Sequence, residues 1–223
     1  HHADEAVDLT IIIPTSQKLL EQAKRLKELH EQKDGMTVRI VPADELYNEF
    51  SSGTPDVSAY RRYMKMLYDR ATDEASQPKY LLLLGDGVWD NRLLTDGCRT
   101  LSADDMLLCF ESENSTSEVH CYVSDDFIGL LDDNESLSTG ALFLGIPDIG
   151  IGRIPVTSPE AAKAVVNKII AYKENKNVGT WQNTLCFMGD DGNYNLHMSD
   201  ADRVAEETIV NYPGYNIRKV MWD

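Results

Sequence analysis

Apolar runs that end at glycine or aspartate recur along the chain, and amphipathic helical stripes separate them. The runs and their endings are residues 80–84 before Gly85-Asp86-Gly87, 119–123 before Ser124-Asp125-Asp126, 185–188 before Gly189-Asp190-Asp191-Gly192, and 218–222 before Asp223. Near-continuous apolar runs are typical of parallel strands that are buried on both faces. Because open parallel sheets bind ligands outside the carboxyl ends of their strands, the pattern predicts several carboxylates at one edge of a sheet.

The whole pattern predicts an alternation of strands and helices. Apolar runs predict strands at 9–13, 36–41, 80–84, 119–123, 149–154, 184–188 and 216–222. Stripes with helical spacing predict helices at 19–31, 43–50, 56–72, 157–172 and 199–210. The tyrosines and methionine of helix 56–72 recur at helical spacing and are expected in the core. This alternation predicts an α/β fold with a doubly wound, mostly parallel sheet and helices on both faces.

One connection is too long for an ordinary α/β loop. Residues 88–118 are polar and acidic and follow the predicted strand 80–84 directly. Connections of this length without structure of their own are uncommon in compact domains and are usually functional. We therefore expect an ordered functional loop or an insertion there.

The charge of the chain narrows the classes of partner. Its 223 residues carry a formal net charge of −16. Such a charge disfavours nucleic acids and anionic membranes, and it favours calcium or a basic substrate. No apolar stretch reaches the roughly 20 residues of a membrane span. His1-His2 is interpreted as the remnant of a purification tag.

The four cysteines follow neither a zinc spacing nor the density of a disulfide scaffold. Cys186 lies inside an apolar run and is predicted to be a buried thiol. Cys98, Cys109 and Cys121 lie in one polar region. One disulfide among these three, in an oxidising compartment, is left open by the sequence.

Two polar clusters follow predicted strands and carry candidate chemistry. In the first, glycines allow a tight turn after residues 80–84, and Asp86, Asp90 and Asn91 offer the oxygen ligands that calcium prefers. The alternative is that these residues only cap the next turn. In the second cluster, residues 189–200, His197 is either a general base or metal ligand, or a structural loop histidine. The sequence contains no phosphate-binding P-loop and no legible Ser/His/Asp set.

Several motifs, in this order, resemble the gingipain family of cysteine peptidases. They are YLLLLGD at 80–86, SDDFIG at 124–129, IGIGR at 149–153, the helix end at 168–172 and the segment 181–206. Their order and spacing match over nearly the whole chain. Within the family, residues 48–54, 60–70 and 85–92 are most similar to the surface sortase of the type IX secretion system.

The resemblance implies a caspase-like α/β fold whose chemistry uses a cysteine and a histidine. In the family the histidine lies in a Gly-His-Gly turn, and the cysteine follows the next strand, both later than the strand that matches residues 216–222. We therefore expect the Cys-His dyad outside these 223 residues, so that neither Cys186 nor His197 inherits a catalytic role and this part alone is inactive. The implied organisation is a first α/β subdomain at 3–118, with the long loop 88–118, and the start of a second, caspase-like subdomain at 119–223, truncated on its C-terminal side.

Two residues inherit family roles through the resemblance. Asp191 lies where the family has an acid that orients the catalytic histidine, although the gingipains have glutamate there. Asp200 lies where the family has the aspartate that selects arginine or lysine side chains in the S1 pocket. The alternative for Asp200 is an acid that complements the dipole at the start of helix 199–210.

The function implied is a cysteine endopeptidase that cleaves C-terminal sorting signals of secreted proteins. Its partners would be those protein substrates and other secretion-system components, at the extracellular face of the bacterial outer membrane, with no nucleic acid. No cofactor is required beyond structural calcium at Asp86 and Asp90. Two other classes stay open. One is a non-catalytic, acidic, calcium-binding α/β module that docks basic partners. The other, a phosphate-handling enzyme like the response regulators, is disfavoured because no lysine lies at a matching strand end.

Overall fold

The computed structural model describes residues 1–114, 116–117, 120–133, 135 and 145–222. Contacts between residues divide the chain into two units, His1–Ile170 and Ala171–Asp223, and each is described by itself. The subdomain boundary predicted at residue 118 lies inside the first unit. Within the described residues, no helix is long and apolar enough to cross a membrane.

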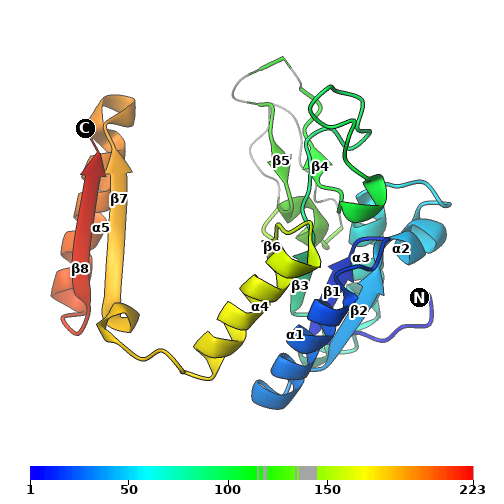
Figure 1. Ribbon diagram of the computed structural model, residues 1–223, viewed down its shortest axis with the longest axis horizontal. Coiled ribbons are helices and arrows are strands. Elements are labelled where there is room, and N and C mark those ends of the chain that lie inside the picture. The colour runs from blue at the N-terminus through cyan, green and yellow to red at the C-terminus, as the bar shows by residue number, and fades with distance from the viewer. Residues whose placement is uncertain (115, 118–119, 134, 136–144, 223) are drawn as a thin grey trace. The chain divides into compact units, whose positions relative to one another are not determined.

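The first unit is built on a four-stranded parallel sheet (Figure 1). Its strands are β1 (Leu9–Ile13), β2 (Val38–Pro42), β3 (Tyr80–Leu84) and β6 (Gly150–Ile154), in the spatial order β2-β1-β3-β6. Leu9 lies opposite Val38 on one side and Tyr80 on the other, and Tyr80 lies opposite Gly150. The chain starts in the middle of the sheet and builds outward in both directions, which confirms the doubly wound topology predicted from the sequence.

Helices cover both faces of this sheet. On one face α1 (Leu20–Lys33) and α4 (Pro159–Lys173) pack against Ile11 and Ile13 of β1. On the other face α2 (Ala43–Phe50) and α3 (Ser58–Arg70) pack against Ile12. Because side chains alternate across a strand, successive residues of β1 enter different cores, and all of β1 is buried. The predicted core stripe of α3 is confirmed by the burial of Tyr60, Tyr63, Met64 and Leu67.

In its described residues, the long connection after β3 adds no strand to the main sheet. β4 (Phe110–Glu111) and β5 (Val123–Ser124) form an antiparallel pair of their own, flanked by 3-10 turns η2 (Ala103–Asp105) and η3 (Asp126–Gly129). The prediction of a parallel strand at 119–123 is therefore wrong for the described residues of this run, since β5 pairs with β4 in antiparallel orientation. Residue 119 lies outside the described residues, as do residues 115 and 118 of the predicted loop.

The second unit is a strand–helix–strand repeat. The turn η4 (Thr180–Asn183) leads into β7 (Thr184–Asp190), α5 (Gly192–Asn211) follows, and β8 (Asn216–Trp222) pairs with β7 in parallel. Within residues 171–222 only Ala205 is buried, while Met188 and Trp222 are 72% and 76% exposed. These apolar side chains are thus left uncovered within their own unit.

All four cysteines are free thiols. Cys98 and Cys109 are buried, whereas Cys121 and Cys186 are exposed. The buried thiol predicted at Cys186 is wrong for a simple geometric reason. Gly189 faces α5 so closely that a Cβ there would lie 2.8 Å from a helix carbonyl. Cys186 is three residues away on the same strand and therefore lies on the opposite, uncovered face.

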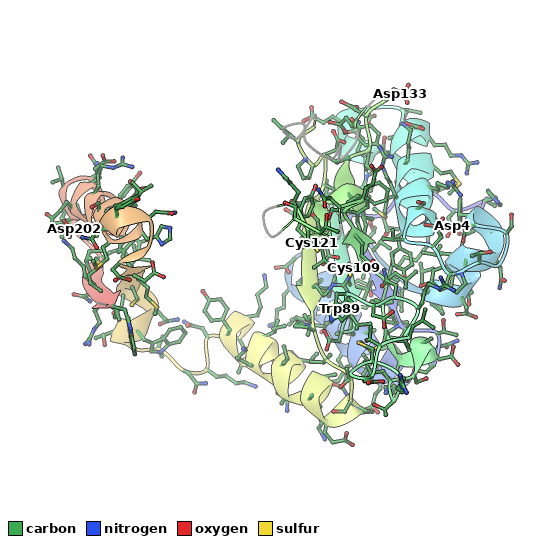
Figure 2. All side chains as sticks on the ribbon, turned by 90° about the horizontal axis from the view of Figure 1, so that it is seen from above. Asp4, Trp89, Cys109, Cys121, Asp133 and Asp202 are labelled. Carbon is green, nitrogen blue, oxygen red and sulfur yellow. The ribbon has the colours of Figure 1, made fainter. Side chains whose placement is uncertain are left out.

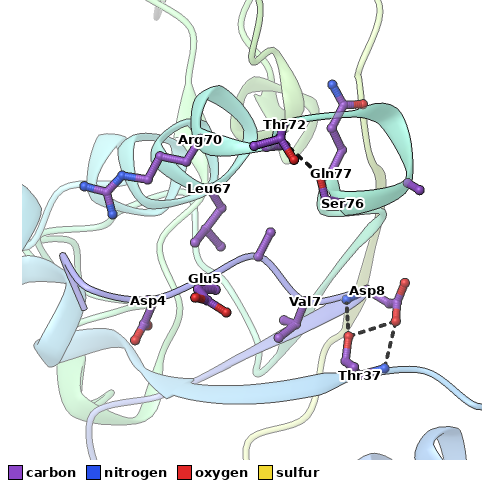
Figure 3. A pocket seen from close by; sticks show the side chains of 13 residues that line it. Asp4, Glu5, Val7, Asp8, Thr37, Leu67, Arg70, Thr72, Ser76 and Gln77 are labelled. Atoms are coloured by element: carbon purple, nitrogen blue, oxygen red, sulfur yellow. Dashed lines mark hydrogen bonds between the residues drawn. The ribbon is translucent and has the colours of Figure 1, made fainter.

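Asp8 ties the starts of three strands together, and Figure 3 shows its hydrogen bonds with Thr37. Its carboxylate accepts hydrogen bonds from the backbone N–H and the hydroxyl of Thr37, both at 2.8 Å, just before β2. It also accepts a hydrogen bond from Nζ of Lys79, at 2.6 Å, just before β3, while Asp8 itself leads into β1. The bond with Lys79, followed by those with Thr37, lowers the pKa of Asp8 to about 2.

Asp8→Asn is expected to reduce the free energy of unfolding at neutral pH by about 1–2 kcal/mol. A carboxyl whose pKa is lower in the folded protein than in the unfolded chain contributes stability above about pH 4, and this contribution is lost as the pH falls towards 2. Urea unfolding across that range should therefore show the difference between variant and parent shrinking with acidification. Glu28→Gln, on the exposed side of α1, makes the same charge change as a control. An equal loss in both variants would contradict the role of Asp8.

Candidate functional site

The four aspartates singled out in the sequence follow two strands, one in each unit. Asp86 and Asp90 come after β3 in the first unit. Asp191 comes directly after β7 in the second unit, and Asp200 lies further along in α5. The structure therefore gives two candidate sites, each at the carboxyl end of a parallel strand, where ligands of such sheets bind.

Arg153 joins the end of β6 to the segments around the end of β3. Its Nε and Nη2 donate to the two carboxylate oxygens of Asp125 at 2.8 and 2.7 Å. Nη1 donates to the carbonyls of Gly85 and Leu107 at 3.2 and 3.4 Å, and Nη2 donates to the carbonyl of Leu108 at 3.0 Å. A guanidinium has five N–H donors. Every donor of Arg153 thus has an acceptor within the protein.

This arrangement makes Arg153 a structural residue. Burial disfavours its charge, since its side chain is 13% exposed, but the hydrogen bonds with Asp125 outweigh burial and keep its pKa above the usual value. With all its donors engaged, Arg153 has none to offer to a substrate. It instead fixes Asp125 and the chain at Leu107 against the sheet, which gives a physical reason for the SDD and GR motifs.

The carboxyl end of β3 is covered by residues 103–110. The backbone N–H of Leu107 donates to the carbonyl of Asp86 at 2.8 Å, and the side chain of Leu107 is fully buried. Gly85 has no room for a side chain, because a Cβ there would lie 2.9 Å from Pro14 and 3.0 Å from Leu107. The sequence predicts carboxylates along the edge at the carboxyl end of β3. In the structure, residues 103–110 of the long connection partly fill this edge.

The predicted calcium ligands act as acceptors within their own turn. Oδ1 of Asp86 accepts the N–H of Gly87 at 2.9 Å. Oδ2 of Asp90 accepts the N–H of Thr95 at 2.7 Å, and this hydrogen bond lowers the pKa of Asp90. Across the part of the chain that the structure describes, no three His, Cys, Asp or Glu side chains gather as a metal site would require. Oδ1 of Asn91 and Oγ1 of Thr95 are nevertheless buried without a hydrogen-bond partner, so oxygen donors remain next to Asp90.

A cavity of about 550 Å³ lies at the opposite edge of the sheet. Figure 3 shows Asp4, Glu5 and Asp8 along one side of it, with Arg70 and Thr72 on the other. This edge carries the amino ends of β1 and β3, whereas parallel sheets bind ligands at the carboxyl ends. The carboxylate of Asp8 is already engaged in joining the strand starts. We therefore do not assign the functional site to this cavity despite its volume.

In the second unit, three side chains at the end of β7 form a hydrogen-bonded chain. Nδ1 of His197 lies 2.5 Å from Oδ1 of Asp190, and Nε2 of His197 lies 3.0 Å from Nδ2 of Asn193. The hydrogen bond with His197, and after it the N–H of Gly192, lower the pKa of Asp190. His197 and Asp190 also line a cavity of about 410 Å³, together with Met188, Gly189, Val220 and Trp222.

The backbone of this turn is left-handed. Asn193, Tyr194 and Asn195 have φ values of 52°, 58° and 66°, a region that costs a non-glycine residue about 1–2 kcal/mol. A Cβ at Gly192 would lie 2.8 Å from the ring of His197. The glycine therefore allows the histidine to reach back over the turn to Asp190. His197 is held by its own turn, which is the structural alternative named for it above.

Asp191 and Asp200 lie in different surroundings within this segment. Asp191 precedes α5, is exposed, and caps no N–H group of the helix. Asp200 is exposed within α5, with its Oδ1 3.2 Å from Nη2 of Arg203. Regular helix begins by Leu196, so Asp200 lies beyond the first turn and cannot strongly complement the helix dipole, which acts within that turn. The alternative role predicted for Asp200 is therefore wrong, because the helix starts earlier than residue 199.

Two features of these sites were missed from the sequence. A signal for the Arg153–Asp125 pair was present, since a lone charge inside the apolar run 149–154 needs a buried partner. No comparable signal marked Asp190. It sits beside Asp191 in a turn, and its contact with His197 depends on the left-handed backbone between them.

Arg153→Lys is expected to lower the free energy of unfolding by about 2–4 kcal/mol. Lysine keeps the charge but cannot make the fork to Asp125 or reach the three carbonyls, so it leaves buried acceptors unpaired. Urea denaturation at neutral pH measures the loss. The control is Arg99→Lys, whose guanidinium pairs with Asp96 at 61% exposure, where the change should stay within about 0.5 kcal/mol. Similar losses in the two variants would show that Arg153 does not hold the edge together.

Comparisons with known proteins agree with the fold and with the motifs. Residues 2–223 match the model of Peptidase family C25. The structure of dimeric latent PorU from Porphyromonas gingivalis is similar, with a TM-score of 0.68 and 37% identity over 81% of this chain and 17% of that chain. A structure described as a protease matches with a TM-score of 0.62 and 14% identity, over 98% of this chain and 40% of that one, and supports the fold alone. None of the curated proteins compared with the chain matches it.

These matches differ in how much of each protein they cover. The chain spans 17% of the PorU chain, so it corresponds to a small part of that protein. The family match, in contrast, runs over almost all of the present sequence. Because it extends over residues 2–223, the chain belongs to peptidase family C25, the gingipain family.

Proposed function

We propose that this chain is part of a cysteine endopeptidase of the sortase type, which cleaves C-terminal sorting signals of secreted proteins at the extracellular face of the outer membrane. The observation that carries the proposal is the 37% identity to PorU over 81% of the chain. Its partners would be these protein substrates and other secretion-system components, and no nucleic acid. The cysteine and histidine that act on the peptide bond would lie in the polypeptide outside residues 1–223.

Within this proposal Asp191 is the acid that orients the catalytic histidine. Its exposed carboxylate caps no helix N–H, so it is available to accept a hydrogen bond from an imidazole. The hydrogen-bonded chain Asp190–His197–Asn193 fixes the turn that carries Asp191. His197 then has a positioning role, and Asp191 contacts the reacting group.

Asp200 is proposed to select arginine or lysine at the P1 position of the substrate. Its carboxylate pairs with Arg203 on the same helix, at side-chain exposures of 54% and 64%. Such an exposed pair is worth about 0–1 kcal/mol. A substrate guanidinium that arrives with its own binding contacts can therefore displace Arg203, and a bidentate arginine–carboxylate pair gives the selectivity.

In the full-length enzyme, Asp200→Ala is expected to reduce kcat/KM by about 100-fold for substrates with Arg or Lys at P1. For substrates with a neutral P1 residue, kcat/KM should change much less. Asp191→Asn should lower kcat about tenfold or more without changing the P1 preference, because it acts through the histidine. Glu207→Ala, an exposed acid on the same helix, is the control. A P1 preference that survives Asp200→Ala would contradict the pocket assignment.

We also propose a structural calcium ion at Asp86 and Asp90. Calcium prefers six to eight oxygen ligands, and the buried, unpartnered oxygens of Asn91 and Thr95 fit that requirement. One carboxylate oxygen of Asp86 also lacks a hydrogen-bond partner among the described residues. The ion would supply cohesion to the turn and no chemistry.

Removal of calcium by a chelator is expected to lower the melting temperature by several degrees. The reason is that bound calcium would add about 1–3 kcal/mol to the free energy of unfolding. Asp90→Asn should lower it similarly and abolish the further effect of the chelator. Asp104→Asn, an exposed acid outside the turn, should leave the chelator effect intact. No thermal shift on chelation would leave Asp86 and Asp90 as turn residues only.

A second candidate is a non-catalytic acidic module that docks basic partners, favoured by the net charge of −16. The full-length polypeptide separates the two functions. Cleavage of a peptide that contains a C-terminal sorting signal, blocked by a thiol reagent, supports the peptidase. Binding of the same peptide without cleavage supports the docking module.

A further inference from the structure

We propose that the small cavity at the carboxyl end of β3 binds one basic side chain, arginine or lysine, of a protein partner. The cavity measures about 220 Å³, and its walls include Asp86, Trp89, Cys109, Val123 and the Arg153–Asp125 pair. That volume is below the roughly 300 Å³ at which small-molecule sites begin. It suits a single side chain better than a whole metabolite.

The charges of the cavity leave one open acceptor. Both carboxylate oxygens of Asp125 accept hydrogen bonds from Arg153, and every donor of Arg153 is engaged, so this pair is neutral and closed to ligands. Asp86 uses Oδ1 to accept the N–H of Gly87. Its other oxygen has no hydrogen-bond partner among the residues that the structure describes. When no calcium is bound at Asp86, the cavity therefore presents a single unbalanced negative charge.

The remaining walls are apolar and uncovered. Trp89 is 64% exposed and Val123 is 52% exposed. Figure 2 labels Trp89 and Cys109, which line this cavity. Burial raises the pKa of the Cys109 thiol, so the thiol adds no negative charge at neutral pH.

These walls match the two parts of a basic side chain. The alkyl stem of arginine or lysine packs on apolar surface while its head stays polar. The head can pair with Asp86, and the indole face attracts a cation. An acidic side chain would be repelled by Asp86, and an apolar one would leave Asp86 unpaired. The net charge of −16 also draws basic partners toward the protein. This site holds whether or not the protein is a peptidase, because it uses no catalytic residue.

The test is a titration of the full-length protein with N-acetyl-arginine amide, followed through the indole N–H signal of Trp89 in NMR spectra. A chelator is present, so that no calcium competes at Asp86. The matched ligand is N-acetyl-citrulline amide, which has the same shape without the charge. The arginine ligand should produce a saturable shift, with affinity at least about fivefold higher than that of the citrulline ligand.

Asp86→Asn should weaken arginine binding about fivefold or more, since the amide keeps the acceptor for Gly87 but loses the charge. Glu28→Gln changes the net charge equally at an exposed position on α1 and should leave the affinity unchanged. Trp89→Leu removes the indole and thereby assigns its NMR signal. In this variant the affinity is followed through the amide signal of Gly87, and binding of the arginine ligand should weaken about two- to fivefold. Because Trp89 is exposed, Trp89→Leu should fold, and it tests the site even if Asp86→Asn does not fold. Equal binding of the two ligands, or equal behaviour of Asp86→Asn and Glu28→Gln, would overturn the proposal.

Discussion

The arrangement of the first unit at its strand ends depends on the burial of one guanidinium. A charge at the end of a strand is costly to remove from water unless every donor finds an acceptor. Arg153 meets that condition by gathering Asp125 and the carbonyls of Gly85, Leu107 and Leu108 around itself. Segments far apart in the sequence are thereby held at one edge. The course of residues 103–110 across that edge meets this requirement, because it brings the carbonyls of Leu107 and Leu108 to Arg153.

Much of this fold could be predicted from the pattern of apolar residues alone. Strands β1, β3 and β8 occupy the ranges that the pattern predicts. For β1 and β3 the reason is that interior parallel strands must be apolar at nearly every position. Prediction failed where pairing or packing partners decided the outcome. The run at 119–123 has the composition of a strand, yet its described part pairs with the neighbouring β4 instead of the main sheet. Cys186 has the sequence context of a buried residue, but its face of β7 lacks a cover.

The candidate site was less predictable than the fold. Motif resemblance pointed to Asp191 and Asp200, but it carried no information on what surrounds them. The early start of α5 and the left-handed residues at 193–195 are not reported by any periodic signal in the sequence. Three carboxylates at the ends of β3 and β5 differ in their contacts: Asp125 pairs with Arg153, Asp90 accepts an N–H of its own turn, and Asp86 keeps one oxygen without a hydrogen-bond partner among the described residues. Only the hydrogen bonds of each residue separate these roles.

The distribution of the thiols has a practical meaning for the chemistry of this family. A reagent that labels a nucleophilic cysteine reacts with any accessible thiolate, and accessibility here divides the four cysteines into two pairs. Cys98 and Cys109 are buried, whereas Cys121 and Cys186 are open to reagent. Within residues 1–223, labelling therefore starts from a background of two accessible thiols. Replacing both by serine would remove this background from residues 1–223.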